Sequence, residues 1–385
     1  MTASLAFASA ALVVWLYLVI ARGGFWRASI RDDRDSAAEP RSWPRVVAVV
    51  PARNEADVIA ESLGSLVTQH YPGSFAVILV DDQSSDETAT IAGAAATRAR
   101  APHRLEVLTG LPLPPGWAGK LWAMKQGVDH AARLPEQPTY LLFADADIAF
   151  STDALRHLVA RAEAHQLVLT SLMVKLRCES LAERGLIPAF VFFFQMLYPF
   201  AWVNRPENET AAAAGGCMLV RLDALKKAGG IEAIRSSLID DCALGRKLKS
   251  VGPIWLGLTE RAHSLRPYPQ FSDVRHMVAR SAYDQLQYSP ILLTGVVAAM
   301  ALIFFAPPFF AVFGTGLAQL VGAFAWALMA LAFQPMLQFY RVSPLWGVAL
   351  PAVAALYMIF TLDSAYQYTR GRGGMWKGRV QARGT

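Results

Sequence analysis

Asp145 and Asp147 are the residues best placed to do chemistry. They follow residues 139–144, an apolar run typical of a buried strand. Two carboxylates two residues apart at a strand end can face one cation, directly or through water. Hard oxygen ligands suit Mg²⁺ or Mn²⁺, which share their coordination shell with substrate phosphates. Two aspartates in a loop are common, so their position after a buried strand makes them a candidate metal site.

A polar motif follows the first predicted strand, residues 45–50: Pro51, then Arg53, Asn54 and Glu55. Pro51 is expected to end the strand and leave the polar side chains at its carboxyl end. The motif also fits a plain strand-to-helix turn in which Asn54 is the N-cap. The residues alone leave both interpretations open.

A second motif begins with Asp81 and Asp82, directly after the predicted strand over residues 75–80. Acidic side chains at a strand end can accept hydrogen bonds from a base or a ribose. Ser85 or Asp86 can cap the next helix. Capping does not explain the two aspartates in front of them.

Asp240 and Asp241 form a third acidic pair, at the start of a helical stretch that runs to Ser250. Acidic residues at a helix N-terminus are favoured by the helix dipole. They could instead supply a general base that takes a proton from an acceptor hydroxyl.

The elements around these motifs alternate between strand-like and helix-like patterns. Strands are predicted over residues 45–50, 75–80, 105–108, 139–144 and 167–170, and helices over 56–69, 86–98, 119–133 and 152–164. Alternation of this kind predicts βαβ units and an α/β fold with a mainly parallel, Rossmann-like sheet. Ligands bind such sheets at the carboxyl ends of strands, so we expect the motifs to lie together.

The composition predicts a membrane protein. Hydrophobic residues make up 54% of the 385 residues and charged residues 17%, too apolar for an ordinary soluble enzyme. Charges concentrate between Arg22 and Arg280. The nearly charge-free runs lie outside that region, over residues 5–20, 291–313, 317–336 and 345–362. The first is marginal for crossing a bilayer, and each of the others spans it or nearly does.

The charge distribution orients the chain. Residues 1–7 carry no Lys or Arg, which favours an uncleaved anchor over a signal peptide. Arginines follow the first run, at Arg22 and Arg27, and place the next domain in the cytoplasm. Three C-terminal crossings would put the tail outside, whereas its basic residues favour the inside. A re-entrant stretch near Pro307 is one solution, and the topology stays open.

We therefore expect an anchor over residues 1–22, an α/β domain over 45–285, a transmembrane region over 290–366 and a basic tail over 367–385. Residues 31–44 form a linker. Residues 186–203, rich in Phe, Leu and Trp, are either a core helix or a helix in the membrane interface. The net charge of +6 lies mostly near the apolar ends, and no basic stripe with aromatics indicates a nucleic-acid partner. Three cysteines without CxxC spacing argue against a zinc site.

The order of the motifs resembles the inverting family 2 glycosyltransferases with a GT-A fold, over residues 45–249. The resemblance implies that Asp82 contacts the nucleobase, most often of a UDP-sugar. It implies that Asp145 and Asp147 bind a divalent metal and the diphosphate. The base comes from the second member of the acidic pair, Asp241. Here Asp240 replaces the usual Glu, so either aspartate could act as the base.

A closer resemblance covers nearly the whole chain. The segments 116–120 (GWAGK), 215–220 (GGCMLV) and 370–379 (RGRGGMWKGR) are similar to the hopene-associated glycosyltransferases of bacteria. These are related to enzymes of the ceramide glucosyltransferase type. The resemblance implies a hexosyltransferase of the bacterial inner membrane that acts on a lipid acceptor such as a hopanoid.

Further residues take roles from the same resemblance. Lys120 could neutralise the donor phosphates or could be a solvated lysine. Gly215 and Gly216 would let the backbone approach the sugar or acceptor, or could mark a strand bulge. His263 could complete the metal shell, as a late histidine does in several GT-A enzymes, or could be structural.

Arg280 and Gln285 occupy the region where processive relatives carry a Gln/Arg/Trp motif at the acceptor channel. The Trp is missing here, which argues against a processive polymer synthase.

Two alternatives to a glycosyltransferase make different demands on the sequence. A nucleotidyltransferase would need a glycine-rich, lysine-bearing loop after the first strand, and residues 51–55 contain no glycine. A non-catalytic nucleotide-binding membrane partner would be expected to lose acidic positions that are all present.

Overall fold

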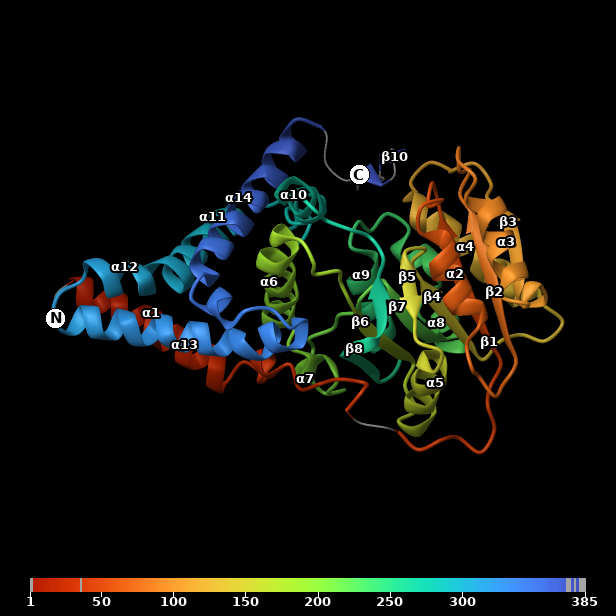
Figure 1. The fold of residues 1–385 in the computed structure, drawn as a ribbon, viewed down its shortest axis with the longest axis horizontal. Coiled ribbons are helices and arrows are strands. Elements are labelled where there is room, and N and C mark those ends of the chain that lie inside the picture. Colours follow the sequence, from red (N-terminus) through yellow and green to blue (C-terminus); the bar gives the residue numbers. More distant parts are fainter. Residues whose placement is uncertain (1–2, 35–36, 372–374, 377–378, 381–385) are drawn as a thin grey trace. The chain divides into compact units, whose positions relative to one another are not determined.

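The structure is a computed structural model that describes residues 3–34, 37–371, 375–376 and 379–380. The chain divides into two compact units (Figure 1), which are described separately below. In their described parts, the first comprises residues 1–29, 178–201 and 268–374, and the second residues 30–177, 202–267 and 375–385. Most of the predicted basic tail, including Arg372, Lys377 and Arg383, lies outside the described residues.

The second unit is built on a sheet whose strands, among the described residues, lie in the order β3-β2-β1-β4-β7-β6-β8-β5. Their bounds are β1 Val46–Ala52, β2 Phe75–Asp81, β3 Leu105–Thr109, β4 Tyr140–Ala144, β5 Ile148–Phe150, β6 Leu169–Lys175, β7 Cys217–Arg221 and β8 Ile254–Ser264. A short hairpin, β9 Met375–Trp376 with β10 Arg379–Val380, lies in the tail.

The sheet is mixed, which corrects the prediction of a mainly parallel one. Strands β1 to β4 form a parallel half, with β1 between β2 and β4 and β3 outside β2. Strand β7 then runs antiparallel to both β4 and β6. Strand β8 is parallel to β6, and β5 antiparallel to β8. Pro51 lies inside β1 rather than at its end, paired with Val80.

Helices of the second unit are α2 Ile59–Val67, α3 Thr88–Arg98, α4 Gly119–Arg133, α5 Ala154–Ala164, α8 Leu222–Lys227 and α9 Asp240–Lys249, with short 3-10 turns at Pro102–Arg104 and Ile231–Ile234. Strand β1 is buried along its whole length, so its apolar run does not alternate. Val46, Ala48 and Val50 belong to the core cluster that includes residues of α2. Val49 faces α4 instead, where a Cβ on Gly127 would lie 2.4 Å from Val49 Cγ1. Gly127 therefore permits the close packing that fixes α4, and the residues at its start, over the sheet.

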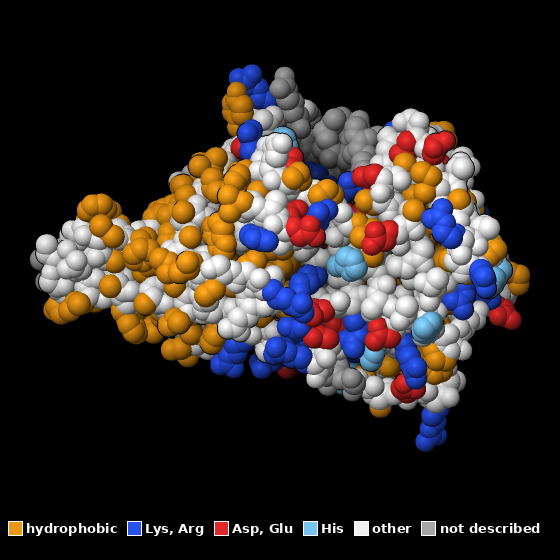
Figure 2. All heavy atoms as spheres, viewed as in Figure 1, with side chains coloured by type: hydrophobic (Ala, Val, Ile, Leu, Met, Phe, Trp, Pro, Cys, Tyr) orange, Lys and Arg blue, Asp and Glu red, His pale blue; other side chains and the backbone are white. Residues whose placement is uncertain are grey.

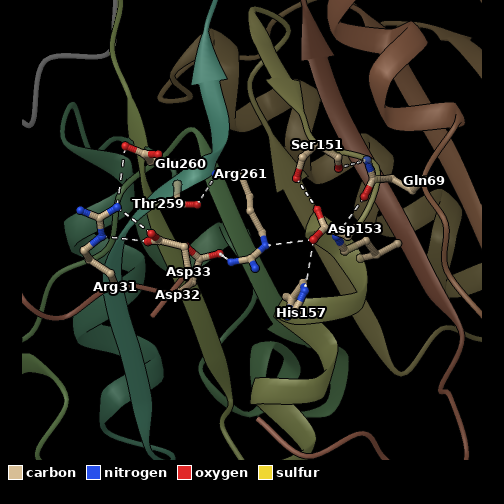
Figure 3. Close-up of polar contacts among 11 residues, drawn as sticks. Arg31, Asp32, Asp33, Gln69, Ser151, Asp153, His157, Thr259, Glu260 and Arg261 are labelled. Carbon is tan, nitrogen blue, oxygen red and sulfur yellow. Dashed lines mark hydrogen bonds and ion pairs between the residues drawn. The ribbon is translucent and has the colours of Figure 1, made fainter. Parts of the chain in front are cut away.

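The predicted linker begins with residues that dock on β8. The Asp32 N–H donates to Leu258 O at 3.1 Å. Arg31 pairs with Asp33, and Arg261 of β8 reaches both Asp32 and Asp153 (Figure 3). We call Arg31, Asp32, Asp33, Asp153 and Arg261 the linker cluster.

The first unit is almost entirely helical. Its elements are α1 Ala3–Ile20, a 3-10 turn Phe25–Arg27, α6 Leu181–Leu197, α10 Phe271–Ala279, α11 Pro290–Met300, a π-helical turn Ala301–Phe305, α12 Ala306–Phe313, α13 Leu317–Tyr340, a 3-10 turn Pro344–Gly347 and α14 Leu350–Thr369. The short helix α7, Phe200–Val203, begins in this unit and ends in the second. Among the described residues, three helices are long and apolar enough to cross a membrane: Ala3–Ile20, Pro290–Phe313 and Leu317–Tyr340. Helix α14, over the last predicted run, is not among these three.

The helix Pro290–Phe313 continues through Pro307 and Pro308, where a re-entrant turn had been one possibility. Proline lacks an N–H, so Pro307 cannot donate to the carbonyl of Ile303 four residues earlier. Ile303 lies in the π-helical turn Ala301–Phe305, and such turns often occur where an α-helix is disturbed. The indole N–H of the buried Trp15 donates to Ile303 O at 2.7 Å. Helix α1 therefore supplies the hydrogen bond that Pro307 cannot make.

Helix α6 packs inside this unit by aromatic contacts. The ring of Phe192 lies 5.0 Å from that of Phe333, and Phe193 lies 5.0 Å from Tyr357. The segment predicted as 186–203 thus begins earlier, at Leu181, behind a capping box formed by Ser180 and Glu183.

Large hydrophobic side chains also cover the outside of the apolar helices (Figure 2). The most exposed in α1 and α11 to α13 are Phe7, Val13, Ile20, Ile291, Phe309, Val312, Phe313, Leu317, Leu320, Phe324 and Leu331. Soluble monomers rarely expose patches of this kind.

Candidate active site

Four side chains from three elements form the centre of the site, and we call Lys120, Asp145, Asp240 and Asp241 the site cluster. Lys120 is the second residue of α4, Asp145 follows β4, and the other two open α9. Lys120 Nζ lies 2.9 Å from Asp145 Oδ1 and 3.1 Å from Asp240 Oδ2. Residues predicted from three separate motifs are therefore in contact.

Lys120 lies at an electrostatically unfavourable position. The N-terminal end of a helix carries partial positive charge, which disfavours a lysine in its first turn. The carboxylates of Asp145 and Asp240 offset this cost. Functional sites are the places where a residue is expected to go against such a local preference of the helix.

The acidic side chains crowd one another. Burial and the negative charge of Asp240 raise the pKa of Asp241 to about 6. Burial, with the charge of Asp147, also raises the pKa of Asp145, although Lys120 opposes it. Burial disfavours the charge on Lys120, but Asp145 and Asp240 outweigh it and raise the pKa of Lys120, which stays cationic. The Asp240 Oδ2 atom is buried and is held by the charge of Lys120, without hydrogen-bond geometry to any described group. One lysine for the three carboxylates of the site cluster leaves an excess of negative charge.

Gly215 borders the cluster. Its N–H donates to Asp241 Oδ2 at 2.9 Å. A Cβ on Gly215 would lie 3.4 Å from both Asp241 Oδ2 and Lys120 Nζ, so glycine keeps this side of the cluster open. Gly216 is constrained differently, because its Cβ would lie 2.9 Å from Val174 Cγ2 in the core.

Asp147 is held by a residue that the sequence analysis did not select. Arg266 Nε donates to Asp147 Oδ2 at 3.0 Å, and the same guanidinium donates to Glu55 Oε2 at 2.6 Å. Ser264 Oγ also lies 3.3 Å from Asp147 Oδ2. Arg266 follows the segment that contains His263, and that segment was the signal that could have pointed to it.

The two polar loops at the ends of β1 and β2 are tied together. Arg53 donates to the carbonyls of Asp82 and Gln83 at 2.5 and 3.1 Å, and lies 3.8 Å from the fully buried Asp82 carboxylate. Asn54 takes a left-handed conformation, with φ of 51°, and its side chain accepts from Ser85 N at 2.8 Å. These loops lie side by side because β1 and β2 are parallel neighbours.

The capping roles proposed for these loops are not the ones observed. The N-cap of α2 is Val58 rather than Asn54, and the N-cap of α3 is Glu87. Asp86 does accept from the Thr88 N–H in the first turn of α3. The left-handed turn at Asn54 explains the difference, because it directs the amide towards the neighbouring loop.

His263 is exposed in β8, next to Ser264. Successive side chains of a strand point to opposite faces. Ser264 reaches Asp147, so His263 is directed away from it.

Arg280 and Gln285 belong to the first unit. Arg280 is the exposed C-cap of α10, and Gln285 donates to the Tyr198 hydroxyl at 2.6 Å. The structure does not join these two residues to the site cluster, and their role as acceptor-side residues stays a prediction.

A metal site can be tested against the acidic groups. In the part of the chain that the structure describes, no three His, Cys, Asp or Glu side chains are arranged to hold a metal ion. In enzymes that bind phosphate-bearing substrates, Mg²⁺ is commonly held by one or two carboxylates together with the substrate phosphates. Asp145 and Asp147, next to an excess of negative charge, fit that smaller donor set.

Comparisons with known proteins bear on the family and the fold of this unit. Residues 47–229 match the family described as Glycosyl transferase family 2. No curated protein sequence matches the chain. The solved mannosyltransferase PcManGT from Pyrobaculum calidifontis, in complex with GDP-Man and Mn²⁺, is 18% identical, with a TM-score of 0.54 over 94% of this chain and 99% of that one. At this identity the likeness shows the fold alone.

A second solved structure, TarS from S. aureus in complex with UDP-GlcNAc, is 16% identical over 87% of this chain and 95% of that one. Its TM-score of 0.40 is too low to establish a common fold. The family match covers the loops after β1 and β2, Lys120, Asp145 and Asp147. It favours a glycosyltransferase over a nucleotidyltransferase. The fold is mixed α/β with a GT-A-like sheet, and residues 47–229 form a glycosyltransferase domain of family 2.

Proposed function

We propose that the chain transfers a sugar from a nucleotide-sugar to an acceptor hydroxyl with inversion, and that Asp241 is the general base. The observation that carries this proposal is the site cluster. Asp241 has a pKa raised to about 6, close to the range in which a base is effective at neutral pH. The Gly215 N–H holds its Oδ2 atom in place. Single displacement then needs no covalent intermediate on the protein.

Asp145 and Asp147 are the residues that we propose to hold a divalent cation, Mg²⁺ or Mn²⁺. Such a cation, when bound, neutralises charge that develops on the leaving diphosphate. Lys120 lies against Asp145 and would add a second positive charge beside the phosphates. His263 is not part of this proposal, since it is directed away from Asp147.

We propose a UDP-sugar as donor, with Pro51, Arg53, Asn54, Glu55 and Asp82 on the nucleotide side. The family resemblance supports this assignment, and the adjacent loops of β1 and β2 support a shared surface. The similar structure from P. calidifontis holds GDP-Man. GDP-sugars are therefore the first alternative donors to test.

A lipid acceptor in a membrane is proposed from the first unit. Three helices are long and apolar enough to cross a bilayer, and their outer surfaces carry exposed Phe, Leu and Ile. An apolar acceptor would reach the enzyme from the lipid bilayer. The resemblance of segments 116–120 and 215–220 to hopene-associated enzymes favours a hopanoid, with the catalytic domain facing the cytoplasm of a bacterial inner membrane.

The test is transfer by the full chain in detergent. Purified protein is incubated with Mn²⁺, a panel of UDP- and GDP-sugars and a bacterial lipid extract, and products are identified by mass spectrometry and by NMR of the anomeric carbon. We expect one donor to yield a glycolipid of inverted configuration. A retained configuration would refute the single displacement, and transfer only to water-soluble acceptors would refute the lipid assignment.

A further inference from the structure

Arg266 holds one of the two carboxylate oxygens of Asp147, a proposed ligand of the cation. Its Nε atom donates to Asp147 Oδ2 at 3.0 Å, and Ser264 Oγ approaches the same oxygen at 3.3 Å. Its NH2 group lies on Glu55, at the start of the loop after β1. Arg266 is thus an internal cation in contact with one of the two carboxylates of the predicted metal site.

A guanidinium and a divalent cation on one carboxylate repel each other, whichever of its two oxygens each of them contacts. Binding of the metal ion to Asp147 therefore weakens the contact with Arg266, and that contact weakens the binding of the metal ion. Lys120 places a second internal cation on the other carboxylate, Asp145, at 2.9 Å. Before the nucleotide-sugar binds, Asp145 and Asp147 each already have a positive partner, which weakens their attraction for a metal ion.

Glu55 and Asp147 differ in their access to water. Glu55 is only 6% exposed and loses its cationic partner if Arg266 leaves entirely. The Asp147 side chain is 16% exposed and would gain a metal ion as its new partner. The guanidinium can therefore stay on Glu55 through NH2 while its Nε edge turns away from Asp147.

A diphosphate is an anion that the Nε edge of Arg266 can bind once it has turned away from Asp147. Arginine binds phosphate oxygens through paired N–H groups, which an ammonium group does not reproduce. The donor of a family 2 glycosyltransferase carries its diphosphate to the metal site, so the new anion arrives where Arg266 is displaced.

We propose that Arg266 is a donor-binding residue that exchanges Asp147 for the donor diphosphate, so that the metal ion and the nucleotide bind cooperatively. This inference rests on the proposed metal site at Asp145 and Asp147. It adds a residue and a coupling that neither the motifs nor the resemblance assigned.

The test measures binding rather than activity. The full chain in detergent is titrated with Mn²⁺, followed by EPR of the free ion, with and without UDP, and again with GDP. The Mn²⁺–nucleotide complex formed in buffer is measured in parallel and subtracted. We expect nucleotide to tighten Mn²⁺ binding on the order of tenfold, a typical coupling between sites.

Arg266→Gln should change the two affinities in opposite directions. Mn²⁺ alone should bind more tightly, because its competitor is gone, while the nucleotide should bind more weakly and the coupling should fall towards onefold. Arg266→Lys keeps the charge without the planar group. It should leave Mn²⁺ binding near wild type and weaken only the nucleotide.

Arg261→Gln is the matched control, since Arg261 also bridges two carboxylates, Asp32 and Asp153, and lies in β8, the strand that Arg266 follows (Figure 3). It should leave the coupling unchanged. Parallel weakening of Mn²⁺ and nucleotide in both Arg266 variants would overturn the inference and indicate a structural role. Wild-type protein that binds Mn²⁺ without any coupling would overturn the inference but leave the proposed function standing. Failure to bind Mn²⁺, with transfer unaffected by chelator, would overturn the inference together with the proposed metal dependence.

Discussion

The site cluster and the linker cluster belong to the same unit and use the same residue types, but they treat charge differently. In the linker cluster, burial raises the pKa of Asp153, but hydrogen bonds from Ser151 and Arg261 outweigh it and the pKa is lowered. Arg31 does the same for Asp33. In the site cluster, burial and neighbouring carboxylates together raise the pKa values of Asp145 and Asp241.

The difference separates a structural ion-pair network from a reactive one. Asp32 shows that a raised pKa alone is insufficient, because burial raises it within the linker cluster while Thr259 and Arg261 oppose the shift. At Asp241 the like charge of Asp240 is the second-largest cause of the raised pKa, whereas at Asp32 the like charge of Asp33 is only a minor cause. Like charges held together cost stability, so their retention points to function.

The largest contrast is expected between two aspartates that follow consecutive strands of the chain, Asp145 after β4 and Asp153 after β5. Asp145→Asn should lower transfer on the order of 10²–10³-fold, because it removes a proposed metal and diphosphate contact. Asp153→Asn should leave transfer within about twofold, as expected for a surface change away from the chemistry. Both are measured as kcat/KM at saturating Mn²⁺. Equal losses in the two variants would remove the distinction between the clusters.

The pH dependence of transfer offers a second contrast. A base with a raised pKa is active when deprotonated, so kcat/KM should rise with pH through about 6, the pKa of Asp241. Asp240→Asn removes the neighbouring negative charge and should move this acid limb to lower pH. Asp33→Asn, in the linker cluster, is the control and should not move it. An acid limb that stays in place in Asp240→Asn would contradict the proposed coupling.

The smallest expected effect is on stability. Arg261→Gln leaves the buried carboxylate of Asp32 without its cation and should cost about 1–3 kcal/mol of unfolding free energy. Arg221→Gln, which removes an exposed pair with Asp223, should change stability by less than about 0.5 kcal/mol. Thermal unfolding of both variants measures the difference. Comparable losses would show that the linker cluster does not depend on burial.

Much of the site could be predicted from sequence because its residues lie at the ends of strongly patterned elements. Helix α4 was predicted with both of its observed ends, Gly119 and Arg133, and this placed Lys120 in its first turn. The strands β1, β2 and β4 are continuous apolar runs, so the polar residues after them stood out. Metal binding, donor identity and the role of Asp241 stay predictions.

Arg266 could not be found in the same way. It reaches Asp147 across 119 residues of sequence, because β8 pairs antiparallel with β5. Strand β5 has only three residues, Ile148–Phe150, and β8 contains Glu260, Arg261 and His263, which break its apolar pattern. Neither strand was predicted, so the segment that contains His263 was the signal near Arg266, and it did not show that Arg266 reaches the acidic motif.

The most direct test of the account is the Asp241→Asn variant of the full chain. Transfer should fall on the order of 10²–10⁴-fold, the range for loss of a general base. Binding of Mn²⁺ and nucleotide should stay within a few-fold of wild type. This result would place Asp241 in the chemical step. Transfer at the wild-type rate, with binding intact, would contradict the assignment of Asp241 as the base.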